Sequence, residues 1–288
     1  MKQPIKHTVT TIQAMKTAGT PITMLTAYDA TQAMLAQEAE IDIILVGDSV
    51  GMVVLGHEST IFVTIEDMIH HAKAVRKGAP RTMMIVDMPF LTYHQTTADT
   101  VRLAGRLMQE AMADAVKLEG GTRIVPHVEA LVQAGIPVCG HLGLTPQSVL
   151  QMGGYKVQAK DPESAQRLVH DAAAIQESGA FLLVLEGVPT SVGRFVTQSV
   201  SIPTIGIGAG DRCDGQVLVF HDLLGLSYAS KPKFVKQYAS LRNVVVDAIQ
   251  SYRDDVRTRR FPDGAHRYDI GVSGFLDEVI PGESGREN

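Results

Sequence analysis

Eight apolar segments of strand length recur along the chain, and no other feature of the sequence limits the possible folds so strongly. Apolar residues run through each segment without alternating with polar ones. Strands that are apolar on both faces are typical of a parallel sheet covered on both sides. The segments span residues 22–27, 41–46, 82–86, 115–118, 136–140, 181–185, 204–207 and 217–220.

Helical patterns lie between these segments. In residues 98–111, for example, apolar side chains recur at the three- and four-residue spacing of one helix face. The predicted helices span residues 31–40, 65–76, 98–111, 125–134 and 164–177, with a short one near 191–195. Parallel strands that alternate with helices in this way predict an α/β fold, a (β/α)8 TIM barrel, and a doubly wound sheet is the alternative.

The length of 288 residues suits one large α/β domain. We expect a single barrel domain over residues 1–265. It includes a long C-terminal helix that begins after Lys231, contains Val235 and ends before Pro262. Residues 266–288 contain several glycines and acidic residues, and we expect them to form a C-terminal tail.

Composition and charge exclude several classes of partner. A net charge of −5 and a pI near 6.0 indicate no basic surface for nucleic acid. The chain has no apolar run of the roughly 18 residues that a membrane-spanning helix needs, and its N-terminal segment lacks the apolar core of a signal peptide. Its two cysteines, Cys139 and Cys213, form no CxxC motif, which fits a reducing compartment. We therefore expect a cytoplasmic protein that binds neither nucleic acid nor a membrane.

Polar and charged side chains stand at the ends of five consecutive predicted strands. In a (β/α)8 barrel the carboxyl ends of the strands form one rim, and catalytic groups lie there. Buried charge without a partner is unfavourable, so such a cluster typically binds a metal or a substrate. In strand order, the candidates are Asp48 and Ser49, then Asp87, then Lys117 and Glu119, then His141, and finally Glu186.

Each candidate taken alone has a structural alternative. Asp48 could cap a helix or form an Asx turn. Glu119 could form a structural ion pair with Lys117, since side chains two residues apart on a strand share a face. His141 could be a histidine that only satisfies local hydrogen bonds. The joint pattern favours a functional site over these separate explanations.

The chemistry of the cluster indicates a metal-dependent reaction. Carboxylate ligands without cysteine or an HExxH motif suit a hard cation such as Mg²⁺. Two or three carboxylates would leave coordination positions open. A 2-oxo acid, which offers a keto and a carboxylate oxygen, fits such a vacancy. The metal would then act as a Lewis acid and stabilise an enolate.

Several segments of the sequence resemble the ketopantoate hydroxymethyltransferase family. The resemblance extends over residues 5–265 in unbroken order. It rests on MLTAYDA (24–30), ILVGDSVGMVVLGHEST (44–60), IVDMPF (85–90), AVKLEGG (115–121), PVCGHLGLTPQS (137–148), LEGVP (185–189) and IGIGAG (205–210). The family belongs to the phosphoenolpyruvate/pyruvate group of TIM barrels, in agreement with the fold expected above.

The resemblance implies a specific reaction. A hydroxymethyl group passes from 5,10-methylenetetrahydrofolate to 3-methyl-2-oxobutanoate and gives 2-dehydropantoate, the first step of pantothenate biosynthesis. It also implies a homo-oligomer, a decamer. By resemblance, Mg²⁺ is held at Asp48, Asp87 and Glu119, and Glu186 is the proton acceptor. The residues expected at the oxo acid are Asp48, Ser49, Asp87, Lys117 and His141.

Two other functions are compatible with such a barrel. One is a carbon–carbon lyase or phosphonomutase of the same barrel group. Those relatives often carry a cysteine segment of the type KxCGH on a mobile loop, whereas the loop after the third strand here, MPFLTYHQT, has no cysteine. The other is a non-catalytic barrel that binds a metabolite, which would not need Asp48, Asp87, Lys117 and Glu186 together.

Overall fold

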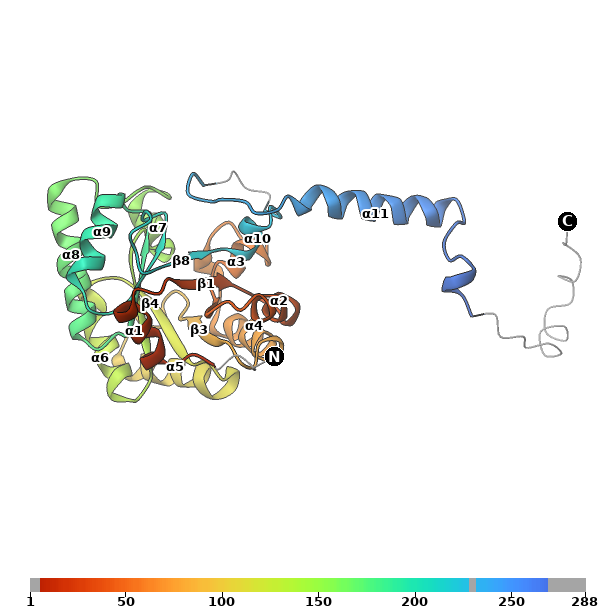
Figure 1. The fold of residues 1–288 in the computed structure, drawn as a ribbon. Helices are drawn as coiled ribbons and strands as arrows, with labels where there is room; N and C mark the ends of the chain where they lie inside the picture. The colour runs from red at the N-terminus through yellow and green to blue at the C-terminus, as the bar shows by residue number, and fades with distance from the viewer. Residues whose placement is uncertain (1–5, 228–231, 269–288) are drawn as a thin grey trace, which may run out of the picture. The chain divides into compact units, whose positions relative to one another are not determined.

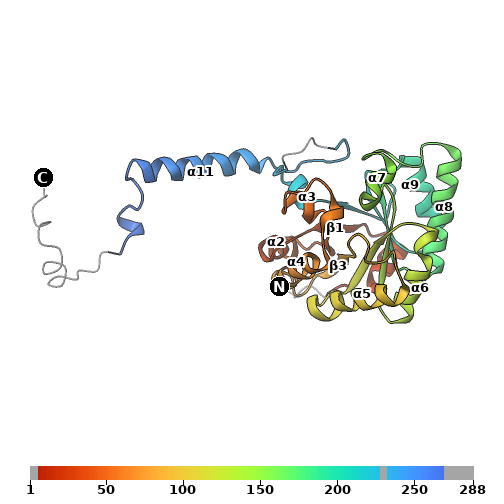
Figure 2. The ribbon, with the colours of Figure 1, turned by 180° about the vertical axis from the view of Figure 1, so that it is seen from behind.

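The computed structural model describes residues 6–227 and 232–268. Eight strands form a closed barrel in chain order, and every neighbouring pair, including β8 with β1, is parallel (Figures 1 and 2). The predicted TIM barrel is confirmed, and the doubly wound alternative is wrong. The strands are β1 (Ile22–Thr26), β2 (Ile43–Val46), β3 (Met83–Asp87), β4 (Ala115–Glu119), β5 (Val138–Gly143), β6 (Leu182–Glu186), β7 (Thr204–Ile207) and β8 (Gly215–Leu218).

Helices cover the outside of the barrel (Figure 1). Several of these helices begin at a capping box, in which side chains near the helix start accept hydrogen bonds from free N–H groups of the first turn. Thr64 with Asp67 forms the box of α4, and Asp161 with Ser164 forms that of α8. The long outer helices are α2 (Ala30–Glu38), α4 (Ile65–Gly78), α5 (Thr97–Ala111), α6 (Val125–Gln133), α8 (Pro162–Glu177) and α9 (Thr190–Ser199). Short helices follow β2, β5 and β8, namely α3 (Val50–Val53), α7 (Val149–Met152) and α10 (Phe220–Leu223).

The last strand begins earlier than predicted. The apolar pattern indicated residues 217–220, but β8 begins at Gly215, and Phe220 already starts α10. Gly215 pairs with both neighbouring strands, and a Cβ atom there would lie 2.3 Å from the backbone oxygen of Ile22. The close approach of the first strand therefore selects glycine, which an apolar pattern does not detect.

The C-terminal helix also differs from its prediction. Helix α11 spans Leu241–Arg257, so it ends before Pro262 as expected but begins later than Lys231. Val235 lies outside the helix and is buried. The chain divides into two compact units between Ala239 and Ser240, so α11 belongs to the second unit. The division at residue 265 stays a prediction, and most of the expected tail lies outside the described residues.

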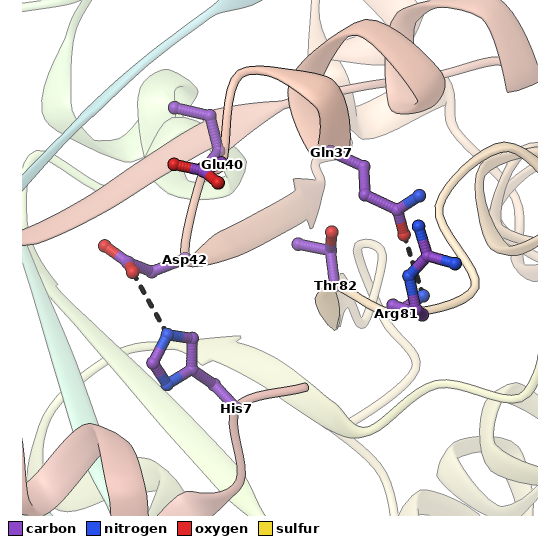
Figure 3. Close-up of a pocket in the computed structure, with 7 residues that line it drawn as sticks. His7, Gln37, Glu40, Asp42, Arg81 and Thr82 are labelled. Carbon is purple, nitrogen blue, oxygen red and sulfur yellow. Dashed lines mark hydrogen bonds and ion pairs between the residues drawn. The ribbon is translucent and has the colours of Figure 1, made fainter. Parts of the chain in front are cut away.

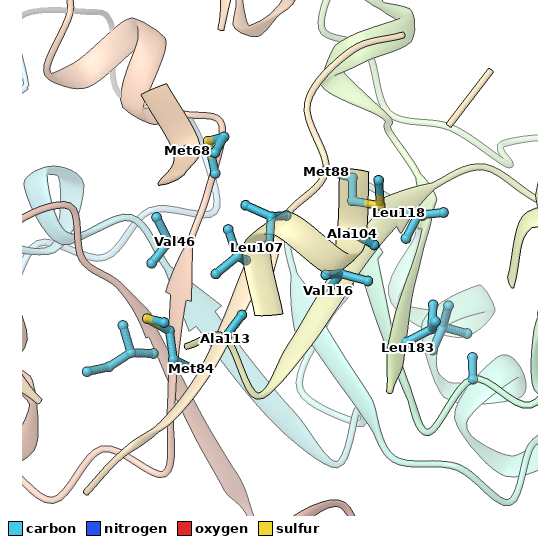
Figure 4. Packing of buried hydrophobic residues seen from close by; sticks show 14 of the residues in the cluster. Val46, Met68, Met84, Met88, Ala104, Leu107, Ala113, Val116, Leu118 and Leu183 are labelled. Atoms are coloured by element: carbon cyan, nitrogen blue, oxygen red, sulfur yellow. The ribbon is translucent and has the colours of Figure 1, made fainter. Parts of the chain in front are cut away.

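Two apolar cores stabilise the barrel unit. Inward-facing strand residues such as Ile43, Ile85 and Val184 fill the interior of the barrel. Outward-facing residues pack beneath the helices, as Figure 4 shows for Val116 and Leu107, which lie on β4 and α5. Because β2, β3, β4, β5 and β6 each contribute residues to both cores, these strands lack the polar alternation of a half-exposed sheet.

Helix α1 (Val9–Ala18), which the sequence analysis did not predict, packs against the barrel interior. Ile12 is fully buried among the inward-facing strand residues. Lys16 Nζ lies 3.0 Å from Asp214 Oδ2 and donates to the backbone oxygens of Thr197 and Ile202. Ile202 and Asp214 lie just before β7 and β8, so α1 covers the amino end of the barrel. Among the described helices, none is long and apolar enough to cross a membrane.

Candidate active site

Strand alternation points the candidate side chains into the barrel. Side chains two residues apart on a strand share a face, so a polar residue two positions after an inner-core residue also faces inward. Strand register then sets Asp87 beside Lys117 and Glu119 beside His141. The inner-core residues and the polar residues that follow them are Ile85 with Asp87, Ala115 with Lys117, Cys139 with His141 and Val184 with Glu186.

Lys117 is the central cation of the cluster. Its side chain is buried, with Nζ 3.1 Å from Asp87 Oδ1, 4.0 Å from Glu119 Oε1 and 3.1 Å from His141 Nδ1. Burial acts to lower the pKa of Lys117, but the charges of Asp87, Glu119 and Asp48 outweigh it and raise that pKa. Lys117 therefore stays protonated. The expected pairing of Lys117 with Glu119 is present, and it forms one part of a larger network.

His141 bridges two carboxylates. Its Nδ1 lies 3.3 Å from Glu119 Oε1, and its Nε2 lies 3.2 Å from Glu186 Oε2, close enough for an ion pair but not aligned for a hydrogen bond. Burial and the charge of Lys117 act to lower the pKa of His141, but its contacts with Glu119 and Glu186 raise that pKa to about 9. His141 thus contacts two carboxylates and Lys117 and is not an isolated histidine.

Asp48 and Ser49 enter the site from the loop after β2. The backbone N–H of Asp48 donates to Asp87 Oδ2 at 3.0 Å, and Ser49 Oγ lies 2.8 Å from the hydroxyl of Tyr28. Asp48 caps no helix, because the residue at the start of α3 is Ser49 and it makes no capping bond. Burial and the charges of Asp87 and Glu119 raise the pKa of Asp48 well above its usual value.

The site also contains two buried residues, Gln147 and Tyr93, that are not among the candidates predicted from the sequence. Gln147 donates from Nε2 to Asp48 Oδ2 at 2.8 Å, and Tyr93 donates from its hydroxyl to Gln147 Oε1 at 2.6 Å. Both lie in rim loops, after β5 and after β3. The side chain of Gln147 is an amide, which does not ionise, so a pattern of titratable residues does not include it. The one sequence feature that could have indicated Gln147 is its place in the string GLTPQS, two residues beyond Thr145.

The donor set suits a divalent cation. Four carboxyl groups face two basic groups, Lys117 and His141, so acidic groups outnumber basic ones at this rim. Asp87 Oδ1 is buried 3.1 Å from Lys117 Nζ but makes no aligned hydrogen bond. Within residues 6–227 and 232–268, no three His, Cys, Asp or Glu side chains already converge on one point. Lys117 and Gln147 contact oxygens of the carboxylates that a metal would bind. Carboxylate oxygens are nevertheless ligands that suit a hard cation such as Mg²⁺.

A cavity elsewhere on the barrel does not belong to this site. It has a volume of about 330 Å³ and lies beside Asp42 and Thr82, which immediately precede β2 and β3 (Figure 3). His7 lines it and contacts Asp42 at 3.1 Å. The amino ends of the strands are the end of a TIM barrel associated with stability rather than catalysis.

Comparison with known proteins identifies the family. The model of the ketopantoate hydroxymethyltransferase family matches residues 6–264. The 3-methyl-2-oxobutanoate hydroxymethyltransferase of Moorella thermoacetica is 54% identical over 268 residues, which cover 93% of this chain and 100% of that protein. The enzyme of the same name from Geobacillus kaustophilus is 55% identical over 88% of this chain and 91% of its own.

The chain belongs to the ketopantoate hydroxymethyltransferase family. The family resemblance and the expectation of a transferase enzyme are therefore confirmed.

Solved structures with the same fold are much more distant in sequence. A phosphonopyruvate hydrolase superposes with a TM-score of 0.60 at 13% identity, over 95% of both chains. The phosphoenolpyruvate phosphomutase of Streptomyces platensis subsp. rosaceus superposes with a TM-score of 0.59, also at 13% identity and over 95% of both chains. These similarities show that the fold is shared. They do not favour lyase or phosphonomutase activity over that of the family.

Replacement of Lys117 tests the electrostatic balance of the site. Lys117→Met should lower the free energy of unfolding by about 3–5 kcal/mol, since it leaves Asp87 and Glu119 buried without their main cation. The loss should be larger at pH 8 than at pH 5. Without Lys117 the folded-state pKa of Asp87 rises further above its unfolded value of about 4, and a carboxyl shifted in this direction destabilises the fold increasingly as the pH rises.

Urea unfolding at both pH values measures this effect. Lys77→Met, at an exposed position on α4, is the matched control and should change stability little. Equal stability of Lys117→Met and the parent protein at pH 8 would contradict the central role of Lys117.

Proposed function

We propose that this chain transfers a hydroxymethyl group from 5,10-methylenetetrahydrofolate to 3-methyl-2-oxobutanoate, giving 2-dehydropantoate, with Mg²⁺ as cofactor. The observation that carries the proposal is the buried rim cluster, in which the carboxylates and cations expected for this family lie within contact distance of one another. The family match, and the identity of more than half to enzymes of this name, support the same activity and its place at the first step of pantothenate biosynthesis.

Asp48, Asp87 and Glu119 would hold the Mg²⁺. Their side chains are buried, carry hard oxygen donors and come from three successive strand ends. When bound, the metal would draw electron density from the keto oxygen of the substrate and stabilise the enolate.

Lys117 and Ser49 would bind the oxo acid beside Asp48 and Asp87. Lys117 provides a fixed positive charge for the carboxylate of the substrate, and it is already held in place by Asp87 at 3.1 Å. The hydroxyl of Ser49 is oriented by the Tyr28 hydroxyl at 2.8 Å. A preoriented charge and hydroxyl would hold the substrate in one orientation, which is the main contribution of binding groups to catalysis.

Glu186 would accept the C3 proton of the oxo acid. Its side chain is 16% exposed, whereas those of Asp87 and Glu119 are about 4% and 3% exposed, so Glu186 lies at the open side of the cluster. His141 Nε2 lies 3.2 Å from Glu186 Oε2 and would hold this carboxylate in place. The C3 carbanion would then attack the methylene carbon of the folate as one of its C–N bonds opens. Water would supply the hydroxyl group as the second C–N bond breaks, which releases 2-dehydropantoate and tetrahydrofolate.

We also propose a homo-oligomer, a decamer as the family resemblance implies, located in the cytoplasm. Helix α11 supports the assembly, because one of its faces exposes apolar side chains at heptad-like spacing, and such faces are typically covered by another protein chain. They are Val245, Ile249, Tyr252 and Val256, exposed by 46%, 61%, 59% and 44%. The two free cysteines are compatible with a reducing compartment. Sedimentation equilibrium should give the mass of a decamer, and a monomer at micromolar concentration would contradict the assembly.

The metal assignment predicts the behaviour of Asp48→Asn. The variant should keep its fold but bind Mg²⁺ at least about 10–100-fold more weakly, because even loss of a supporting group has that effect and Asp48 would be a ligand. Isothermal titration with Mg²⁺ measures the affinity, and formation of 2-dehydropantoate measures the activity. Asp211→Asn, at an exposed carboxylate in the loop after β7, is the control. Full activity of EDTA-treated protein would contradict the metal assignment.

The role of Glu186 predicts a defect in proton exchange. In D₂O with Mg²⁺, the parent enzyme should exchange the C3 proton of 3-methyl-2-oxobutanoate, which proton NMR follows directly. Glu186→Gln is nearly isosteric and cannot accept a proton, so it should bind Mg²⁺ and the oxo acid yet lose exchange and product formation together, by about 10²–10⁴-fold. If this variant exchanges deuterium at the parent rate, Glu186 is not the base.

A further inference from the structure

A buried hydrogen-bond network connects four rim segments through Gln147. Its Nε2 donates to Asp48 Oδ2 at 2.8 Å and to the backbone oxygen of Met88 at 3.0 Å. Its backbone N–H donates to Glu119 Oε2 at 3.0 Å. The hydroxyl of Tyr93 donates to Gln147 Oε1 at 2.6 Å and accepts from the backbone N–H of Glu119 at 3.1 Å. Gln147 and Tyr93 are 4% and 1% exposed.

Two backbone groups set the directions of the side-chain bonds in this network. The backbone N–H of Glu119 can only donate, so the Tyr93 oxygen must accept from it. The backbone oxygen of Met88 can only accept, so the Gln147 amide cannot rotate by half a turn without placing Oε1 against this oxygen and against Asp48 Oδ2. The Tyr93 proton is then directed to Gln147 Oε1. Gln147 Nε2 therefore faces Asp48 in a single orientation.

This orientation determines which carboxylate oxygens remain available. Gln147 engages Oδ2 of Asp48 through its side chain and Oε2 of Glu119 through its backbone. The oxygens left for other partners are Asp48 Oδ1 and Glu119 Oε1, and the latter lies on the side of His141 and Lys117. One side chain thus sets the rotation of two carboxylates that come from different strands.

We propose that Gln147 and Tyr93 are positioning residues for the metal site, which hold Asp48 and Glu119 in the orientation that binds Mg²⁺. The inference rests on the Mg²⁺ site proposed above. Gln147 acts through the carboxylates it holds, and Tyr93 acts through Gln147. Hydrogen-bond partners behind metal ligands typically contribute 10–100-fold to metal affinity.

Two variants test the network. Tyr93→Phe removes only the hydroxyl and leaves the ring in place, and Gln147→Met keeps an unbranched chain of similar length without hydrogen-bonding atoms. Both should bind Mn²⁺, measured by electron paramagnetic resonance without substrates, about 10–100-fold more weakly than the parent protein. Their product formation should return toward the parent kcat when the Mg²⁺ concentration is raised in proportion.

A matched control separates this effect from a general loss of stability. Thr197→Val removes a buried hydroxyl that donates to the backbone oxygen of Gly193 at 2.8 Å and lies 2.7 Å from Thr204 Oγ1, remote from the rim. It should lower the melting temperature to a similar extent but leave the affinity for Mn²⁺ unchanged. If Gln147→Met does not fold, Tyr93→Phe alone decides the question.

The outcomes are distinguishable. If the parent protein binds Mn²⁺ and both variants bind it equally well, the network is only structural and this inference is wrong, while the proposed function stands. If the parent protein binds neither Mn²⁺ nor Mg²⁺, the proposed metal site itself is wrong, and the positioning role is overturned with it.

Discussion

The site depends on the balance between buried carboxylates and the few cations that accompany them. Asp48, Asp87 and Glu119 are removed from water, and each would raise the free energy of the fold if it stayed ionised alone. Lys117 compensates part of this charge from within the cluster. The proposed Mg²⁺ would compensate the carboxylates that Lys117 does not, so the imbalance that lowers stability would also favour binding of a metal.

Closure of the barrel makes that cluster possible. The parallel strands end at one rim, and the register of β3, β4 and β5 sets Asp87 beside Lys117 and Glu119 beside His141 although the paired residues lie far apart in sequence. The apolar core below them is dense, so the strand ends cannot relax apart when charged groups crowd the rim. Rigid apolar strands thus hold the charged groups close together, and the rim loops add Asp48, Tyr93 and Gln147.

The sequence-based predictions are wrong or incomplete at positions whose structure depends on contacts with distant parts of the chain. Strand β8 begins at Gly215 because its backbone approaches Ile22 closely. Helix α1 was missed because its role depends on Ile12, whose burial inside the barrel cannot be recognised from one short amphipathic segment. Gln147 was missed because an amide acquires a function only from the groups around it. In each case the deciding neighbour is distant in the chain.

The sequence by itself determined the barrel and the identities of its rim residues. Apolar runs that alternate with helical patterns are a local property, and so is the placement of Asp87 or Glu186 at the end of a run. Only the tertiary structure decided that His141 bridges Glu119 and Glu186, and that Gln147 sets the orientation of Asp48. The physical reason is that hydrogen bonds and ion pairs depend on distance and direction in space, and both arise only when the barrel closes.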